Sequence, residues 1–331
     1  MQKKHYVNAI KSLLVAGIGT LIFIGSGALA STTWNVGDIF IAISNGSYEV
    51  RDQSGNLKET LSTGRGGFTT GCAFDGNDDL YVTEFGAGNV SVFAGPAAPH
   101  TNTVFDSGLS SPEMVAFDSS GNVYIGQVGN GGINQYASDG TYLKTIAAGT
   151  RVDFFDIAAD GDTIAFGQEG DRILTASISS GALGADFASG TGGQAFAMRF
   201  LPDGGLLVAD GGNIKRYNSA GSVVDTYDVT AGGSWFALNL DPDGTSFWAG
   251  TAGSGNYYKF DINTGGVDVH TAGPFDPAGD NFFGLCVLGE PTVAMEDYRP
   301  VPTLGILGLV LLILTVVGAG MFWSRASRHT A

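Results

Sequence analysis

Two acidic side chains, Glu113 and Asp153, occupy equivalent places in a repeated unit of the chain. Each stands eight residues before a glycine turn, at Gly121 and Gly161 respectively. A third acid, Asp156, follows shortly after and could add another oxygen. Hard cations such as Ca²⁺ bind about six to eight oxygen ligands, so these carboxylates predict a cation site that is short of a full set. The alternative is that they are solvated acids without a ligand.

Other catalytic chemistry has little support in the sequence. A hydrolase or lyase needs acid–base groups that converge on one site. Between the two apolar ends of the chain stand two histidines, His100 in an inserted loop and His270 in a late strand, and their positions do not predict a shared site. No serine lies in a nucleophile elbow. We therefore assign no catalytic residue.

Aromatic side chains recur just before the strands that begin each unit. They could stack on a sugar or peptide at the rim of a site, or they could pack between sheets; both interpretations stay open. The four that we assign to the rim are Phe154, Phe196, Trp235 and Phe236, within a larger set that also contains Phe68, Phe155, Phe282 and Phe283.

These residues are positioned by a unit of about forty residues that occurs six times. Each copy has a polar turn followed at once by a short apolar strand, and a glycine hairpin turn later in the unit. Six such units predict an all-β, six-bladed β-propeller over residues 31–290. The turn residues recur in steps of 41, 43, 40, 43 and 40 residues, at Gly37, Asp78, Gly121, Gly161, Gly204 and Gly244.

The first unit lacks its own leading strand, and residues 283–288 have the right pattern to supply it. We therefore expect the C-terminal strand to close the ring, which also hides two sheet edges. The two cysteines, Cys72 and Cys286, fall on innermost strands of neighbouring units. An oxidising compartment permits a disulfide between them. Two separate buried thiols are the alternative, because a bond needs Cα atoms within roughly 7 Å.

The third unit carries the clearest family pattern. Pro112 is followed by the strand at residues 114–117, then Asp118, then Gly121-Asn122 and a second apolar strand. This pattern resembles the NHL and streptogramin-lyase-like propellers and, more remotely, the gluconolactonase-like family. The resemblance implies the fold, and the gluconolactonase-like family implies a channel metal such as Ca²⁺. It implies little about function, because such folds host unrelated activities.

Both ends of the chain carry targeting features. Residues 1–30 contain three lysines, an apolar stretch at 13–24 and a small-residue site at 28–30, which predicts a cleaved secretory signal. An uncleaved anchor helix is the alternative. Residues 304–323 are apolar and uncharged, and Arg325 and Arg328 follow them. This pattern predicts a transmembrane helix at 304–323 with a cytoplasmic tail at 324–331. A linker at 291–303 would connect the propeller to this helix.

The run Val301-Pro302-Thr303-Leu304 stands directly at the start of this apolar segment. It resembles the C-terminal sorting signals of the IPTL-CTERM class, which is related to PEP-CTERM. The chain keeps Gly308 of that pattern and departs at Gly305, where serine is usual, and at Leu307, where tryptophan is usual. The resemblance implies a sorting protease and the cell surface of a Gram-negative bacterium. A plain membrane anchor is the alternative.

The charge of the chain limits its partners. The formal net charge is −16, and all 32 acidic residues lie between the two apolar ends. Such a surface repels nucleic acid and anionic lipid. We therefore expect an exported, membrane-tethered or surface-sorted propeller that acts as a non-catalytic binding or structural module for a small molecule, glycan or protein. The alternative is a metal-dependent lactonase- or lyase-like enzyme that uses Glu113, Asp153 and Asp156.

Overall fold

The computed structural model describes residues 31–229, 233–252, 256–271 and 282–292. The predicted signal peptide at residues 1–30, the predicted sorting motif Val301-Pro302-Thr303-Leu304, the predicted transmembrane segment 304–323 and the tail 324–331 lie outside these residues. Within the described ranges, no helix has the length and apolar character needed to cross a membrane.

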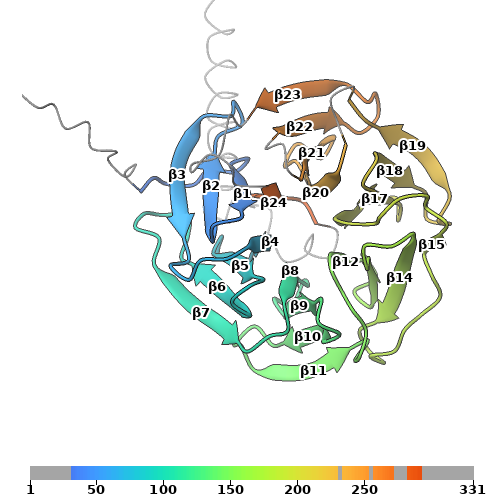
Figure 1. Ribbon diagram of the computed structural model, residues 1–331, viewed down its shortest axis with the longest axis horizontal. Coiled ribbons are helices and arrows are strands. Elements are labelled where there is room, and N and C mark those ends of the chain that lie inside the picture. The colour runs from blue at the N-terminus through green and yellow to red at the C-terminus, as the bar shows by residue number, and fades with distance from the viewer. Residues whose placement is uncertain (1–30, 230–232, 253–255, 272–281, 293–331) are drawn as a thin grey trace, which may run out of the picture.

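Six antiparallel sheets of four strands each are arranged in a ring around a central axis, as the sequence predicts (Figure 1). We call them blades 1 to 6. Blade 1 contains β24 (Phe282–Val287), β1 (Ile39–Ile43), β2 (Ser47–Arg51) and β3 (Leu57–Ser62). Blade 2 contains β4 (Thr69–Phe74), β5 (Leu80–Glu84), β6 (Asn89–Phe93) and β7 (Asn102–Ser107). Blade 3 contains β8 (Pro112–Phe117), β9 (Val123–Gln127), β10 (Gly132–Tyr136) and β11 (Tyr142–Ile146).

The other half of the ring repeats this order. Blade 4 contains β12 (Phe155–Ile157), β13 (Thr163–Phe166), β14 (Arg172–Ser177) and β15 (Ala188–Ser189). Blade 5 contains β16 (Met198–Phe200), β17 (Leu206–Ala209), β18 (Ile214–Tyr217) and β19 (Val223–Tyr227). Blade 6 contains β20 (Trp235–Leu240), β21 (Ser246–Thr251), β22 (Asn256–Asp261) and β23 (Val267–Thr271).

The C-terminal strand closes the ring, which confirms the prediction from the missing leading strand. β24 pairs antiparallel with β1, and Cys286 stands opposite Phe40 in the register. Cys72 of β4 is bonded to Cys286, with their Cα atoms 5.8 Å apart. Of the two alternatives for the cysteines, the structure therefore has the disulfide. It ties the closing strand of blade 1 covalently to blade 2.

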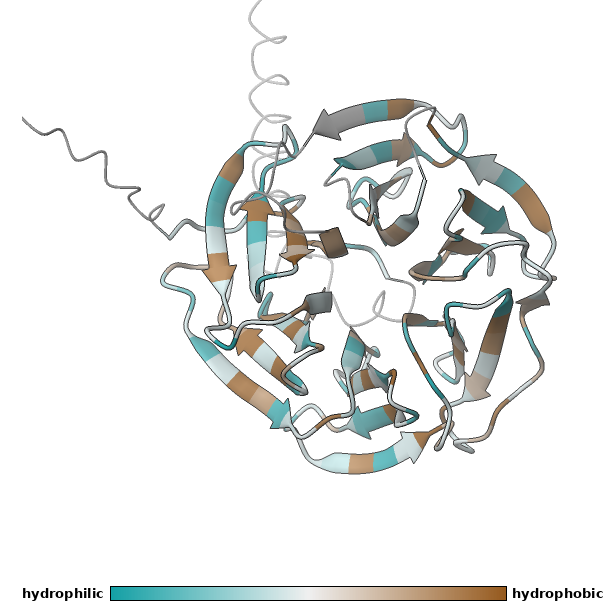
Figure 2. Ribbon diagram, in the orientation of Figure 1, coloured by the Kyte–Doolittle hydropathy of each residue, from teal (hydrophilic) through white to brown (hydrophobic). Residues whose placement is uncertain are grey.

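The hydrophobic core lies between the blades. All five residues of β1 are buried, as are all five of β9, because both faces of a middle strand are covered by neighbouring sheets. The outermost strands instead expose many side chains, and four of the five residues of β19 face solvent. Figure 2 shows this difference: β24 at the axis is apolar, whereas the outer strands alternate between apolar and polar residues.

Aspartates organise the polar turns between the first and second strands of the blades. The Asp118 carboxylate accepts hydrogen bonds from the backbone N–H groups of Ser120, at 2.9 Å, and Asn122, at 3.0 Å. Gly121 in the same turn has φ of 77°, a conformation that glycine adopts without strain. Asp75 accepts equivalent bonds in the second unit. Such local bonds are typical of turns, and they explain why the pattern recurs.

Candidate functional site at the channel mouth

A cavity of about 230 Å³ opens at one end of the central channel. We call it the mouth cavity. Its lining comes from five of the six blades, which places it on the axis of the ring. The lining residues are Phe68, Thr70, Phe85, Glu113, Arg151, Glu169, Phe236 and Phe283.

Strand irregularities direct four of these side chains into the cavity. The pairing register shifts in β8 at Glu113, in β20 at Phe236 and in β24 at Phe283, and each of these residues has no partner in the ladder. β4 is shifted in the same way around Thr70. A bulge re-aims the extra residue and ends regular pairing, and bulges are common next to binding sites. The mouth cavity is thus built by innermost strands whose pairing register shifts at the end of the channel where the cavity lies.

The backbone at Glu113 is held by the neighbouring blade. Its carbonyl oxygen accepts hydrogen bonds from the hydroxyls of Thr70, at 3.0 Å, and Thr83, at 3.1 Å. A Cβ atom on Gly71 would lie 2.3 Å from the same oxygen, so only glycine allows blades 2 and 3 to approach this closely. The backbone position of Glu113 is therefore determined by contacts between blades.

Three carboxylates converge at the mouth. Glu113, Asp153 and Glu169 each offer one oxygen, and these oxygens all lie within 4.8 Å of one another. The structure thus brings together Glu113 and Asp153, which the repeat placed at equivalent positions. It adds Glu169, which the sequence analysis missed. Glu169 lies in the loop after β13 with φ of 54°, a conformation that non-glycine residues adopt rarely.

Arg151 is the second residue that the sequence analysis missed. Its Nε lies 2.8 Å from Asp153 Oδ1, and its Nη2 lies 2.7 Å from Glu169 Oε2. The loop that carries Arg151 and Asp153 is fixed on both sides, because Val152 N–H donates to Gln127 O and Asp153 N–H donates to Gly167 O. The sequence did contain one local indication of the Arg151–Asp153 pair. In the Arg-X-Asp spacing the two side chains point to the same side when the segment is extended.

Burial and charge change the acidity of these groups. The pKa of Glu113 is raised well above its ordinary value, first by burial and then by the nearby charges of Asp153 and Glu169. Burial also raises the pKa of Asp153, against the opposing effect of Arg151. Two adjacent buried carboxyl groups avoid ionising together, so this arrangement favours a proton held by the pair.

The mouth residues fit a calcium cage poorly. Three carboxylates supply fewer than the about six to eight oxygens that Ca²⁺ takes. Two of them, Asp153 and Glu169, are already paired with the guanidinium of Arg151, which a divalent cation would have to displace or repel.

Asp156 lies apart from this cluster. Its carboxylate accepts a hydrogen bond of 2.7 Å from Phe200 N–H and lines a second, smaller cavity of about 30 Å³. Asp156 lines this second cavity, whereas Glu113 lines the mouth cavity and lies within reach of Asp153 and Glu169. The structure therefore does not place Asp156 with Glu113 and Asp153.

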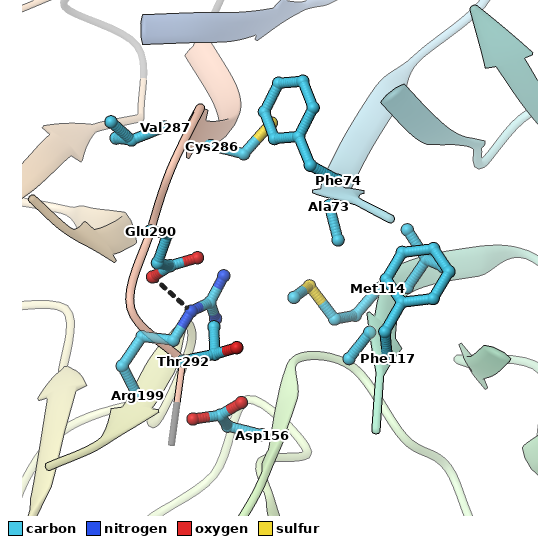
Figure 3. Close-up of a pocket in the computed structure, with 12 residues that line it drawn as sticks. Ala73, Phe74, Met114, Phe117, Asp156, Arg199, Cys286, Val287, Glu290 and Thr292 are labelled. Atoms are coloured by element: carbon cyan, nitrogen blue, oxygen red, sulfur yellow. Dashed lines mark hydrogen bonds and ion pairs between the residues drawn. The ribbon is translucent and has the colours of Figure 1, made fainter. Parts of the chain in front are cut away.

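The second cavity contains its own charged cluster, which Figure 3 shows. Asp156, Arg199 and Glu290 face one another there, and Arg199 Nε lies 2.8 Å from Glu290 Oε1. Burial raises the pKa of Asp156 to about 7, although the positive charge of Arg199 lowers it. Glu290 also accepts hydrogen bonds from Leu240 N–H, at 2.7 Å, and from the Asn239 amide. We call this cluster the base cluster.

The four aromatic residues assigned to the rim have different positions. Phe236 lines the mouth cavity, and its ring contacts those of Phe154 and Phe196 at centroid distances of 5.3 and 4.8 Å. Phe154 is buried and Phe196 is half-buried, and neither lines the cavity.

Trp235 lies in the core rather than on the rim. It is fully buried, and its indole N–H donates to Asp228 Oδ1 at 2.9 Å. Its ring contacts Tyr258 and Phe260 within blade 6. Trp235 keeps its partner in the ladder, Thr251, whereas Phe236 is the bulged residue that lines the cavity.

The histidines lie away from the mouth. The His100 ring stacks on Trp34 at a centroid distance of 3.8 Å, and its nitrogens lie 2.8 Å from the carbonyl oxygens of Ala94 and Thr32. His270 belongs to β23, the outermost strand of blade 6. Among the described residues, the mouth cavity is lined by no histidine and no cysteine.

Comparisons with known proteins identify the fold. No family model matches the chain, and no curated protein matches its sequence. A chain from the crystal structure of a nidogen/laminin complex superposes with a TM-score of 0.63 at 14% identity, covering 77% of this chain and 100% of that one. A catalytically inactive histidine-to-alanine variant of virginiamycin B lyase from Staphylococcus aureus, solved with quinupristin, gives 0.53 at 12% identity, covering 73% and 87%. At such identities the likeness is one of fold alone, and it agrees with the six-bladed β-propeller that the strand order shows.

Proposed function

We propose that this protein is a non-catalytic binding module of the bacterial cell envelope, and that the mouth cavity receives its ligand. The observation that carries the proposal is the cavity itself. It is concave and on the axis, and it combines phenylalanine rings with a few convergent charged groups. That composition is typical of small-molecule sites.

An extracytoplasmic location is supported by the disulfide. Bonds such as Cys72–Cys286 form and persist in oxidising compartments and are rare in the cytosol. The sequence of residues 1–30 supports export, and the apolar segment 304–323 supports a tether. On this proposal the motif Val301-Pro302-Thr303-Leu304 is read by a sorting protease. Mass spectrometry of the mature protein tests this: loss of the chain after the motif supports sorting, and an intact Arg328 means a permanent anchor.

The course of β24 suggests how the propeller would be oriented relative to the membrane. Phe283, near its start, lines the mouth cavity, whereas Glu290, shortly after its end, lies in the base cluster. The chain therefore leaves the ring on the face opposite the mouth. With residues 304–323 in a membrane, the mouth would open away from the lipid.

A metal-dependent lactonase or lyase is the second candidate, and the convergence of Glu113, Asp153 and Glu169 is the observation that favours it. The ion pairs of Arg151 weigh against it. Two measurements on the full chain in detergent distinguish the binding module from the enzyme. The first is the melting temperature with and without millimolar Ca²⁺, and the second is the turnover of a set of simple lactones. A ligand that binds only the folded state raises the melting temperature.

For a binding module we expect neither a calcium-dependent rise nor turnover. A rise and a turnover that are both lost in Glu113→Gln would establish the enzyme and overturn our proposal. Asp225→Asn, a change to an exposed acid on β19, is the matched control.

A further inference from the structure

Glu113 has no cationic partner among the residues that the structure describes. Arg151, the guanidinium at the mouth, is paired with Asp153 and Glu169. The carboxyl group of Glu113 instead meets that of Asp153, although its side chain is only 4% exposed and lines the cavity. The two carboxyl groups share a proton, because adjacent buried carboxyl groups avoid ionising together, and a cation that enters the cavity can take the place of that proton. The mouth therefore holds three carboxyl groups and one guanidinium, and Glu113 is the one of the three that forms no ion pair with Arg151.

The opposite wall of the cavity is aromatic. Phe68, Phe85, Phe236 and Phe283 line it, and the ring of Phe283 contacts those of Phe68 and Phe236 edge to face, at centroid distances of 5.1 and 6.0 Å. Phe68 is 47% exposed and lines the cavity, so part of its ring is available at the opening. Aromatic faces attract cations and also pack against apolar groups.

These two walls select against a divalent metal ion. Such an ion needs more oxygen ligands than the carboxyl groups of the site offer, and the water molecules that would complete its shell would meet phenylalanine rings. A monovalent cation with an apolar body satisfies both walls, because its charged end pairs with Glu113 and its stem replaces water on the rings.

We propose that the mouth cavity binds a primary ammonium group carried on an apolar stem, with the ammonium on Glu113 and the stem against Phe236 and Phe283. This rests on the proposed binding function and names the chemistry of its ligand. The same group occurs in free alkylamines and in the lysine side chains of proteins. An ammonium donates about three hydrogen bonds from one compact charge, and on binding it replaces the proton that Glu113 shares with Asp153.

Isothermal titration of the full chain in detergent tests this with n-pentylammonium chloride as the probe. Pentan-1-ol has the same stem without the charge, and ammonium chloride has the charge without the stem. We expect pentylammonium to bind at least tenfold more tightly than either. We expect Glu113→Gln and Phe236→Ala each to weaken it tenfold or more, and Asp225→Asn to leave it unchanged. The melting temperature of each variant shows whether it is folded.

Other results are also decisive. Equal binding of pentylammonium and pentan-1-ol, or no binding of pentylammonium to the folded wild type, would overturn the ammonium site and leave the binding function standing. Lactone turnover that depends on Glu113 would instead overturn the proposed function. Nα-acetyl-lysine N-methylamide separates the two sources, because binding at least as tight as that of pentylammonium points to a lysine side chain, whereas weaker binding points to a free amine.

Discussion

Cys72 on β4 and Cys286 on β24 are joined across the boundary between blades 1 and 2, 214 residues apart in the chain. The same strand β24 is also hydrogen-bonded to β1. The two ends of the propeller are therefore held together by a sheet ladder and by a covalent bond, and opening the ring requires the loss of both.

Replacing both cysteines by serine should destabilise the propeller strongly. A disulfide that closes so long a loop restricts the unfolded chain, and its removal is expected to lower the free energy of unfolding by roughly 2 to 5 kcal/mol. Urea denaturation with and without a reductant measures this. The reductant should destabilise the wild type and leave the double variant unchanged; an equal effect on both would show that the bond does not support the ring.

Arg151→Gln should lower the free energy of unfolding, because it leaves acidic side chains at the mouth without a positive charge. The substitution leaves Asp153 and Glu169 without their cation. Because the Arg151 side chain is 35% exposed, solvent screens part of the loss, and we expect roughly 1 to 2 kcal/mol. Adding Glu169→Gln should recover part of it. Additive losses in a double-mutant cycle of urea midpoints would show that the two side chains act independently.

Stability should depend on pH through Asp156. Its pKa is raised to about 7 in the folded state, against an ordinary value of 3.8. Between these values the folded protein binds more protons than the unfolded chain, so the free energy of unfolding falls as the pH rises. The contribution is complete below about pH 4 and is lost as the pH passes through about 7.

Asp156→Asn removes this contribution. Relative to wild type, we expect the variant to gain roughly 1 to 3 kcal/mol between pH 5 and pH 8. Chemical denaturation at several pH values measures the difference, with Asp225→Asn as control. A difference that does not change with pH would mean that Asp156 is ionised in the folded protein throughout this range.

Glu290→Gln should loosen the base cluster. It removes the charge that Arg199 meets at 2.8 Å and weakens the acceptor of Leu240 N–H. Arg199 is buried, so we expect a loss of roughly 2 to 4 kcal/mol and faster hydrogen exchange at the Leu240 amide.

The same variant should change the pH response. The charge of Glu290 raises the pKa of Asp156, and without it Arg199 lowers that pKa further. The fall in stability should then occur at lower pH than in the wild type. An unchanged amide exchange rate together with an unchanged pH profile would exclude Glu290 as an anchor of this cluster.

Some of the site could be predicted and some could not, for physical reasons. The equivalence of Glu113 and Asp153 was visible because the repeat places them at the same distance from their turns. Glu169 and Arg151 were not recognised, because they lie in loops whose conformations depend on contacts with segments of neighbouring blades. The separation of Asp156 from Asp153 was not predicted either, because their closeness in the sequence does not show that they belong to different clusters of the channel.

The sequence alone determined the number of blades and how the ring closes. Both depend on local chemistry: aspartate and glycine turns, short apolar strands and a missing leading strand that residues near the C-terminus could replace. Only the tertiary structure decided which side chains reach the mouth. The bulges at Glu113, Phe236 and Phe283 come from the packing of innermost strands around one axis, and no local pattern encodes a register shift that depends on strands far apart in the chain. The pairing of Cys72 with Cys286 was decided in the same way, because it depends on a distance between blades.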